Sequence, residues 1–203
     1  MTVLIEQRGD PRYRDSFWSS ADVGVRQREL AEHWQRIIGR IPGFSVGNIL
    51  DIGPGGGAQT RFLQGLYPRS FITAVDIDAQ SERAAEADGL EVISLDLAAP
   101  RSPERIEHLV SKRSINTIVA LRTSGAVATN LINWYDASNS LAFLVFSLMM
   151  ESEKDEITHV LRNQVRLRGG WPTPLVEGRF FNETAMVLAH WKNIQSSYNK
   201  IWE

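Results

Sequence analysis

Short apolar runs alternate with amphipathic segments along the first two thirds of the chain. The runs are typical of strands buried on both faces, and they lie at about residues 47–52, 71–76, 91–96 and 115–121. The intervening segments have helical spacing, and helices are expected near residues 58–66, at residues 78–87 and from Ser102-Pro103 onward. This alternation predicts an α/β fold of the Rossmann-like type: a mainly parallel sheet with helices on both faces.

The pattern after residue 122 is harder to assign. Residues 130–136 are expected to be helical, whereas residues 141–148 fit either a fifth strand or a buried helix, because periodicity does not separate the two. Acidic residues at the start and arginines at the end predict a helix at residues 151–167. Two later strands, near 174–181 and 185–191, would form a C-terminal antiparallel hairpin.

A further helix is expected before the first strand, at about residues 22–39. A two-domain organisation would need a linker, and we find no Ser/Gly/Pro-rich run in the chain that could be one. We therefore expect a single domain over residues 1–203, with an N-terminal helical cap segment at 1–45 and an α/β core at 46–203.

The composition narrows the classes of partner. The chain has 203 residues, a net charge of −2 and no cysteine. A slightly acidic chain creates no field that attracts nucleic acid, and the longest apolar stretch, residues 141–150, is too short to span a bilayer. Without cysteine there is no disulfide or thiolate metal site, and the N-terminus does not resemble a signal peptide. We expect a cytoplasmic protein that binds neither nucleic acid nor membrane; the oligomeric state stays open.

The most informative segment is Asn48-Ile-Leu-Asp-Ile-Gly-Pro-Gly-Gly-Gly57, an apolar strand that runs into a glycine-rich turn. Glycine lets the backbone adopt φ > 0 and lets a ligand lie against bare main chain. The unpaired N–H groups of the following helix point toward such a ligand. Asp51 places a carboxylate near the same turn, which suits a cationic or zwitterionic ligand better than a polyanion.

The pattern Asp-x-Gly-x-Gly-x-Gly resembles motif I of the class I S-adenosylmethionine-dependent methyltransferases. The order of elements in that family can be followed over roughly residues 46–122. The resemblance implies that the backbone of this turn holds the methionine part of the cofactor. The residues concerned are Asp51, Gly53, Pro54, Gly55 and Gly57.

Two further acidic strand ends match the same family. Asp76 ends the second strand, where the resemblance implies hydrogen bonds to the ribose hydroxyls, and Ile77 would pack against the adenine. Asp96 follows the third strand, where the resemblance implies an acceptor for the adenine amino group, with Leu97 over the ring. The alternative for Asp96 is a residue that caps a turn.

The resemblance becomes weaker at the fourth strand. Asn116 stands where the family often has an acidic residue, and no Asn/Asp-Pro-Pro-Tyr signature follows the strand. This argues against methylation of nucleobase nitrogens. Arg122 and Thr123 lie where cofactor and acceptor meet in the family, and Arg122 would pair with a carboxylate or phosphate or form a surface ion pair.

No catalytic base can be chosen from the sequence. The four histidines are His33, His108, His159 and His190, and no group of them with Asp or Glu has metal-ligand spacing, so no metal is expected. The six tryptophans would form either an aromatic wall or ordinary core. Three arginines near the end of the late helix would form an anion patch or a solvated helix end; they are Arg162, Arg166 and Arg168.

These observations predict an S-adenosylmethionine-dependent methyltransferase that acts on the oxygen or nitrogen of a small molecule and releases S-adenosylhomocysteine. One alternative is a catalytically inactive protein that binds S-adenosylmethionine and has a regulatory role. Another is different chemistry on the same fold, such as aminopropyl transfer or an NAD-linked reaction, because Gly53-x-Gly55-x-x-Ala58 is a loose dinucleotide fingerprint.

Overall fold

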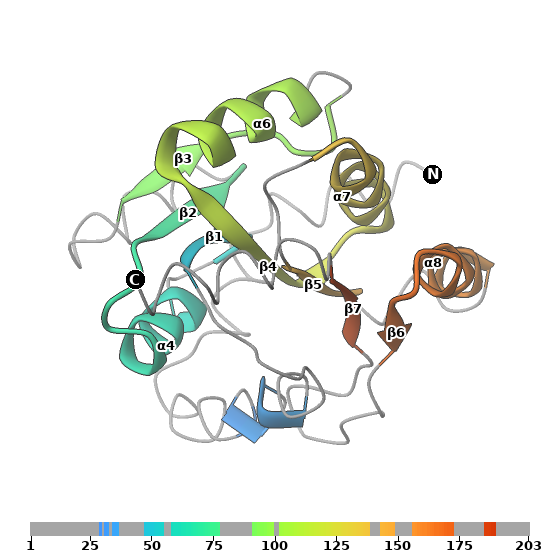
Figure 1. The fold of residues 1–203 in the computed structure, drawn as a ribbon, viewed down its shortest axis with the longest axis horizontal. Coiled ribbons are helices and arrows are strands. Elements are labelled where there is room, and N and C mark those ends of the chain that lie inside the picture. Colours follow the sequence, from blue (N-terminus) through green and yellow to red (C-terminus); the bar gives the residue numbers. More distant parts are fainter. Residues whose placement is uncertain are drawn as a thin grey trace, which may run out of the picture.

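A seven-stranded sheet organises the part of the chain that the structure, a computed structural model, describes (Figure 1). The described residues are 29, 31–32, 34–36, 47–54, 58–77, 91–99, 102–138, 143–148, 156–172 and 185–189. The expected helix at 78–87 and most of the N-terminal cap segment lie outside these residues.

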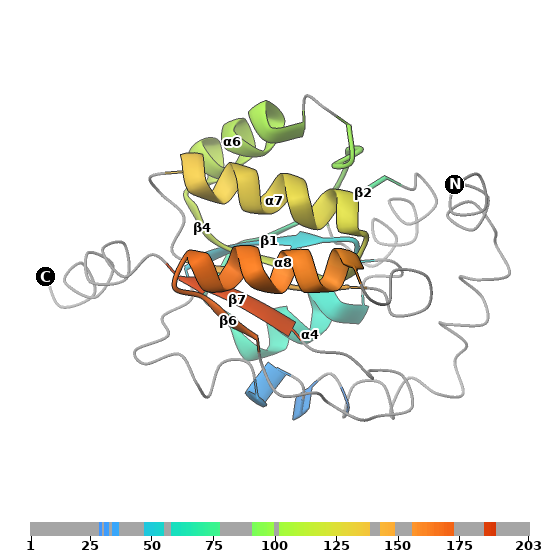
Figure 2. The same cartoon turned by 90° about the vertical axis from the view of Figure 1, so that its right-hand side faces the viewer.

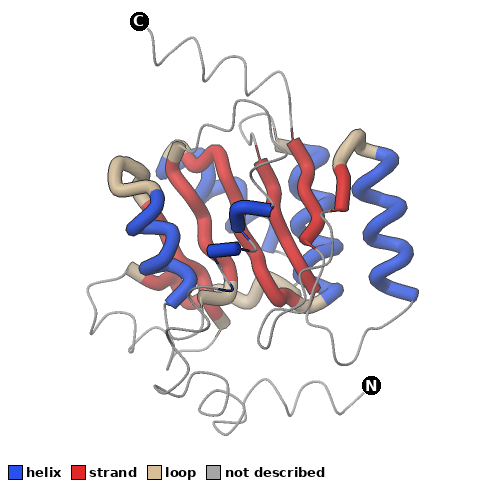
Figure 3. Tube along the Cα trace, turned by 90° about the horizontal axis from the view of Figure 1, so that it is seen from below, coloured by secondary structure: helices blue, strands red, loops and turns tan. Residues whose placement is uncertain are grey.

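The strands follow the order β3-β2-β1-β4-β5-β7-β6. Their bounds are β1 Asn48–Ile52, β2 Ile72–Asp76, β3 Val92–Ser94, β4 Ile115–Thr123, β5 Phe143–Leu148, β6 Trp171–Pro172 and β7 Ala185–Ala189. β1 to β5 pair in parallel, whereas β7 is antiparallel to both β5 and β6. The prediction of a mainly parallel, Rossmann-like sheet that ends in an antiparallel hairpin is therefore confirmed. Figure 3 shows the strands side by side in this sheet.

Helices cover both faces of the sheet. α6 (Ser102–Arg113), α7 (Gly125–Ala137) and α8 (Glu156–Leu167) lie on one face, and α4 (Ala58–Leu66) lies on the other (Figure 2). α7 is longer than the segment predicted at 130–136, because it begins directly after β4, with Ser124 as its N-cap. α8 matches the described part of the helix predicted at 151–167.

The strands fill two cores because successive side chains point to opposite faces. Leu50 of β1 and Leu144 of β5 belong to the core beneath α6, α7 and α8. Their neighbours Ile49 and Val145 belong to the core beneath α4. The sheet thus excludes water from both faces, as the continuous apolar runs in the sequence predict.

The leading segment contributes to the second of these cores. The described residues within the helix predicted at 22–39 are helical. Trp34 is 1% exposed, packs in the core beneath α4, and donates from Nε1 to the hydroxyl of Tyr67 at 2.8 Å. The described residues around Trp34 are therefore anchored on the sheet through this tryptophan.

The two C-terminal assignments are now resolved for the described residues. Residues 143–148 form a strand and not a helix, and this strand lies between β4 and β7. β7 also pairs with β6 at Trp171–Pro172, and the strand predicted at 174–181 lies outside the described residues. Gly170 explains the close approach of this segment, because a Cβ there would collide with the carbonyl oxygen of Val187. Residues 173–184 lie outside the description.

Candidate cofactor-binding site

Three carboxylates of the sequence prediction lie along one edge of the sheet. Asp51 of β1 is in register with Ala74 of β2, which is in register with Val92 of β3. Asp76 is the last residue of β2, and Asp96 follows β3 by two residues. Because β1, β2 and β3 are adjacent and parallel, these residues share the carboxyl edge, where ligands bind in open α/β sheets.

The turn after β1 begins with a backbone conformation that favours glycine. Gly53 has φ +69°. Its N–H donates to the carbonyl oxygen of Val75 of β2 at 2.8 Å, so the first residue of the turn is still hydrogen-bonded to the neighbouring strand. Among the residues that the structure describes, no atom lies within 4 Å of the position a Cβ would take, so their packing does not require glycine and the positive φ does. Pro54 is buried, and Gly55 and Gly57 lie outside the described residues.

The side chain of Asp51 lies behind this turn and is not exposed at the candidate site. It is fully buried. Thr60 Oγ1 donates to Asp51 Oδ2 at 2.6 Å, and Gln59 Nε2 donates to Oδ1. Burial raises the pKa of Asp51 to about 6, the two hydrogen bonds oppose this rise, and the charge of Asp76 adds to it. Both donors come from the first turn of α4, so Asp51 joins β1 to that helix.

The end of β2 is more open. Asp76 is half-buried, and its carbonyl oxygen accepts from the N–H of Leu95 at 2.8 Å, which fixes the start of the loop after β3. Ile77 is 51% exposed. The carboxylate of Asp76 and the exposed side chain of Ile77 are thus adjacent in the chain at this end of β2, and the roles that the family resemblance implies for them stay predictions.

The loop after β3 is held by its own aspartate. Asp96 is exposed, and its Oδ1 accepts from the N–H of Ala98 at 2.9 Å, so this residue does cap a turn. The same interaction leaves the other carboxylate oxygen for a ligand. Leu97 is only 5% exposed and packs in the core beneath α6 and α7, so little of its side chain is available to cover a ring.

Asn130 of α7 also holds this loop, and sequence reasoning missed it. Its Nδ2 donates to the carbonyl oxygen of Leu97 at 3.0 Å. The two residues are 33 positions apart. The only local signal was an amide between the buried residues Ala128 and Leu131, which does not reveal a distant partner.

The end of β4 leads directly into α7. Ser124 caps the helix and accepts from the N–H of Val127 at 3.4 Å. Arg122 belongs to β4, and its side chain lies outside the description. At the other end of this strand, Asn116 Oδ1 accepts from the N–H of Gly47 at 3.0 Å. Asn116 therefore secures the entry to β1 at the edge opposite the candidate site.

The candidate bases and tryptophans are only partly described. His108 and His159 are exposed on helices, and His33 and His190 lie outside the described residues. Trp134 is 3% exposed and donates to Glu107 Oε2 at 2.9 Å, so it is a core residue, like Trp34. The side chains of Trp18 and Trp171 are not described. Within the described ranges, no three His, Asp or Glu residues are arranged to hold a metal ion.

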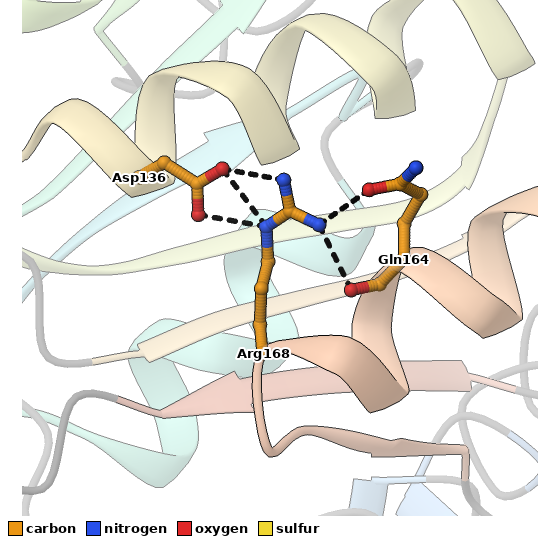
Figure 4. A network of polar contacts seen from close by, with 3 residues as sticks. All are labelled: Asp136, Gln164 and Arg168. Carbon is orange, nitrogen blue, oxygen red and sulfur yellow. Dashed lines mark hydrogen bonds and ion pairs between the residues drawn. The ribbon is translucent and has the colours of Figure 1, made fainter.

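Arg168 joins two helices (Figure 4). Its Nε donates to Asp136 Oδ1 at 2.7 Å, and its guanidinium also donates to the side chain and the carbonyl oxygen of Gln164. The guanidinium of Arg168, which was a candidate for an anion patch in the sequence analysis, therefore connects the end of α7 with the end of α8. Arg162 is half-buried, and its Nε has no hydrogen-bond partner among the residues that the structure describes.

Comparison with solved structures identifies the class of fold. No protein-family model and no curated protein matches the chain. Among solved structures, the plantazolicin methyltransferase BpumL in complex with SAH is 12% identical at a TM-score of 0.59, over 91% of this chain and 92% of that one. The chain has the methyltransferase fold. An O-methyltransferase family protein from Burkholderia thailandensis is 13% identical at a TM-score of 0.57, over 91% of this chain and 61% of that one.

The METTL16 MTase domain has the same methyltransferase fold, with 15% identity and a TM-score of 0.57 over 81% of this chain and 68% of that domain. Identity at this level establishes the architecture and leaves the chemistry to the site itself. None of the described helices is both long enough and apolar enough to cross a membrane.

Proposed function

We propose that the chain is an S-adenosylmethionine-dependent methyltransferase that acts on a small-molecule acceptor. One observation carries the proposal: the carboxyl edge combines a positive-φ glycine turn at Gly53 with carboxylates at Asp76 and Asp96 on the adjacent strands. The methyltransferase fold supports it, as does the SAH bound to the similar BpumL.

The proposed residues divide by the part of the cofactor they would bind. The turn of Gly53, Pro54, Gly55 and Gly57 would hold the methionine part, with Asp51 behind it. Asp76 would accept from the ribose hydroxyls and Asp96 from the adenine amino group. Ile77 would border the ring, whereas the buried Leu97 would support the loop beneath it. Arg122 would lie between cofactor and acceptor, where a guanidinium suits a carboxylate or phosphate.

Methyl transfer depends on the orientation of the reactants and needs no covalent catalysis by the chain. The bound cofactor would supply an activated methyl group on a sulfonium. The chain would hold the acceptor atom close to that group, at about 3–3.5 Å and in line. An O–H or N–H acceptor also loses a proton, which goes to a base or to solvent. The catalytic base remains unassigned.

A small acceptor is favoured by charge. The net charge of −2 supplies no general attraction for nucleic acid, and the segment after β4 lacks the Asn/Asp-Pro-Pro-Tyr signature of nucleobase N-methylation. A cytoplasmic location belongs to the same proposal, because the chain contains no cysteine. Screening of cell extracts for metabolites that gain a methyl group from labelled cofactor would identify the acceptor. Labelling of RNA alone would exclude a small molecule.

The NAD-linked alternative fits the sheet less well. A dinucleotide-binding sheet has the order 3-2-1-4-5-6, whereas here the antiparallel β7 lies between β5 and β6. The buried Asp51 also stands behind the turn that would receive a pyrophosphate.

Titration calorimetry with S-adenosylmethionine, S-adenosylhomocysteine and NAD tests the proposal. We expect binding of the first two only. Asp76→Ala should weaken both by about 1–3 kcal/mol, because the ribose hydroxyls lose a charged acceptor. Glu91→Ala is the matched control, since this carboxylate precedes β3 at the opposite edge and pairs with Arg113. Unchanged affinity in Asp76→Ala contradicts the cofactor assignment, and binding without turnover on any acceptor supports the regulatory alternative.

A further inference from the structure

The loop after β3 receives hydrogen bonds from two directions. From within, Asp96 Oδ1 accepts from the N–H of Ala98, and the carbonyl oxygen of Asp96 accepts from the N–H of Ala99 at 3.4 Å. From outside, Asn130 Nδ2 donates to the carbonyl oxygen of Leu97 at 3.0 Å. The carbonyl oxygen of Leu97 and the N–H of Ala98 belong to one peptide, so the second contact fixes the peptide to which the Asp96 side chain is bound.

We propose that Asn130 is a positioning residue for base recognition, a step that rests on the proposed function. α7 starts at the end of β4, where the acceptor would bind, and Asn130 extends from this helix to the loop that carries Asp96. The free oxygen of Asp96 is useful to an adenine amino group only if the turn holds its other oxygen in place. Asn130 holds that turn against the helix.

The physical reason is that two side chains hold the Leu97–Ala98 peptide from its two sides. Asn130 binds its carbonyl oxygen and Asp96 binds its N–H. Without the amide of Asn130 the peptide loses one of these two restraints and is freer to rotate. Rotation of this peptide would redirect Asp96 and weaken recognition of the base, while the ribose and methionine contacts stay on other strands.

Two ligands separate base recognition from general binding. S-adenosylhomocysteine presents an amino group at position 6 of its purine, and S-inosylhomocysteine presents a carbonyl oxygen there. A carboxylate acceptor favours the first. The wild-type chain should therefore prefer S-adenosylhomocysteine, by about tenfold or more.

Asn130→Leu and Asn130→Asp both remove the donor, the second with almost no change of size. Each folded variant should lose about tenfold in affinity for S-adenosylhomocysteine and keep its affinity for S-inosylhomocysteine, so that the preference disappears. Asn133→Leu is the matched control, because Asn133 is an exposed residue of the same helix. Thermal unfolding of each variant shows that it is folded before calorimetry.

The possible results decide between a positioning and a merely structural role. Loss of the preference in the Asn130 variants but not in Asn133→Leu supports the inference. A preference that survives in a folded Asn130 variant, an equal loss for both ligands, or a wild type that binds both equally overturns it. Absence of any S-adenosylhomocysteine binding by the wild type instead overturns the proposed function, and this is measured first.

Discussion

The hydroxyl of Thr60 donates to the carboxylate of Asp51 at 2.6 Å across the glycine turn. Gln59 donates to the other carboxylate oxygen, so the end of β1 and the first turn of α4 are joined by side chains as well as by the chain itself. This connection stabilises the geometry of a turn whose first residue has a positive φ. The acidic residue of the motif is thereby an anchor for the turn.

Thr60→Val should lower the free energy of unfolding by about 2–3 kcal/mol. The variant keeps the shape of the side chain but leaves an oxygen of a buried carboxylate without its donor, and hydrogen bonds to charged groups are among the stronger ones. Thr60→Ser is the control, since it retains the hydroxyl and removes only a methyl group. Urea unfolding measures both variants. Equal stability of the Val and Ser variants would show that the hydroxyl contributes nothing.

The buried Asp51 also predicts a dependence of stability on pH. Burial raises its pKa from 3.8 to about 6, so the folded state holds a proton that the unfolded state has lost. The resulting stabilisation is complete below pH 3.8 and is lost as the pH rises through about 6. Relative to Asp51→Asn, which does not titrate, the wild type should lose up to about 3 kcal/mol between pH 4 and pH 7. Urea unfolding of both proteins at several pH values measures the difference, and a constant difference would contradict the raised pKa.

The parallel part of the sheet was predictable because its strands are short, apolar and regularly separated by helices. The run at 141–148 stayed open because β5 is buried on both faces, and a strand of this kind has no alternation to distinguish it from a buried helix. The first strand of the hairpin was predicted near 174–181, which lies outside the described residues. The part of β6 that the structure describes, Trp171–Pro172, was not predicted, because it includes Pro172, a residue that sheets tolerate mainly at an edge, and has no apolar pattern.

The site was predictable only as far as it follows the ends of strands. Asp76 and Asp96 could be found because a polar residue directly after a buried strand must lie at the carboxyl edge. The enclosure of Asp51 could not be foreseen, because it depends on how α4 returns over the turn. The contact between Asn130 and Leu97 was equally hidden, since it joins positions 33 residues apart through the packing of α7.

Arg168→Gln should destabilise the protein without affecting cofactor binding. Its ion pair with Asp136 is partly exposed, so solvent screens it, and we expect a loss of about 1 kcal/mol or less, which shrinks further at high salt. The pair joins the ends of α7 and α8, away from the start of α7 at the carboxyl edge. Arg166→Gln is the control, because Arg166 is exposed in the last turn of α8, two residues before Arg168. Thermal unfolding at two salt concentrations and calorimetry with S-adenosylhomocysteine test both expectations. A weakened affinity in Arg168→Gln alone would link this contact to the site.

Asp96→Asn should reverse the preference between purine bases. The turn needs an acceptor for the N–H of Ala98, and the amide oxygen of asparagine can serve there. The amide nitrogen would then take the place of the free carboxylate oxygen and present a donor to the ligand. Such a donor suits the carbonyl oxygen of S-inosylhomocysteine and opposes the amino group of S-adenosylhomocysteine. A site built on a hydrogen bond discriminates strongly against a ligand that leaves it unpaired, so we expect the affinity ratio to change by about a hundredfold, enough to reverse a wild-type preference of about tenfold. Calorimetry with the two ligands measures this ratio. If the ratio in Asp96→Asn equals that of the wild type, Asp96 does not contact position 6 of the base.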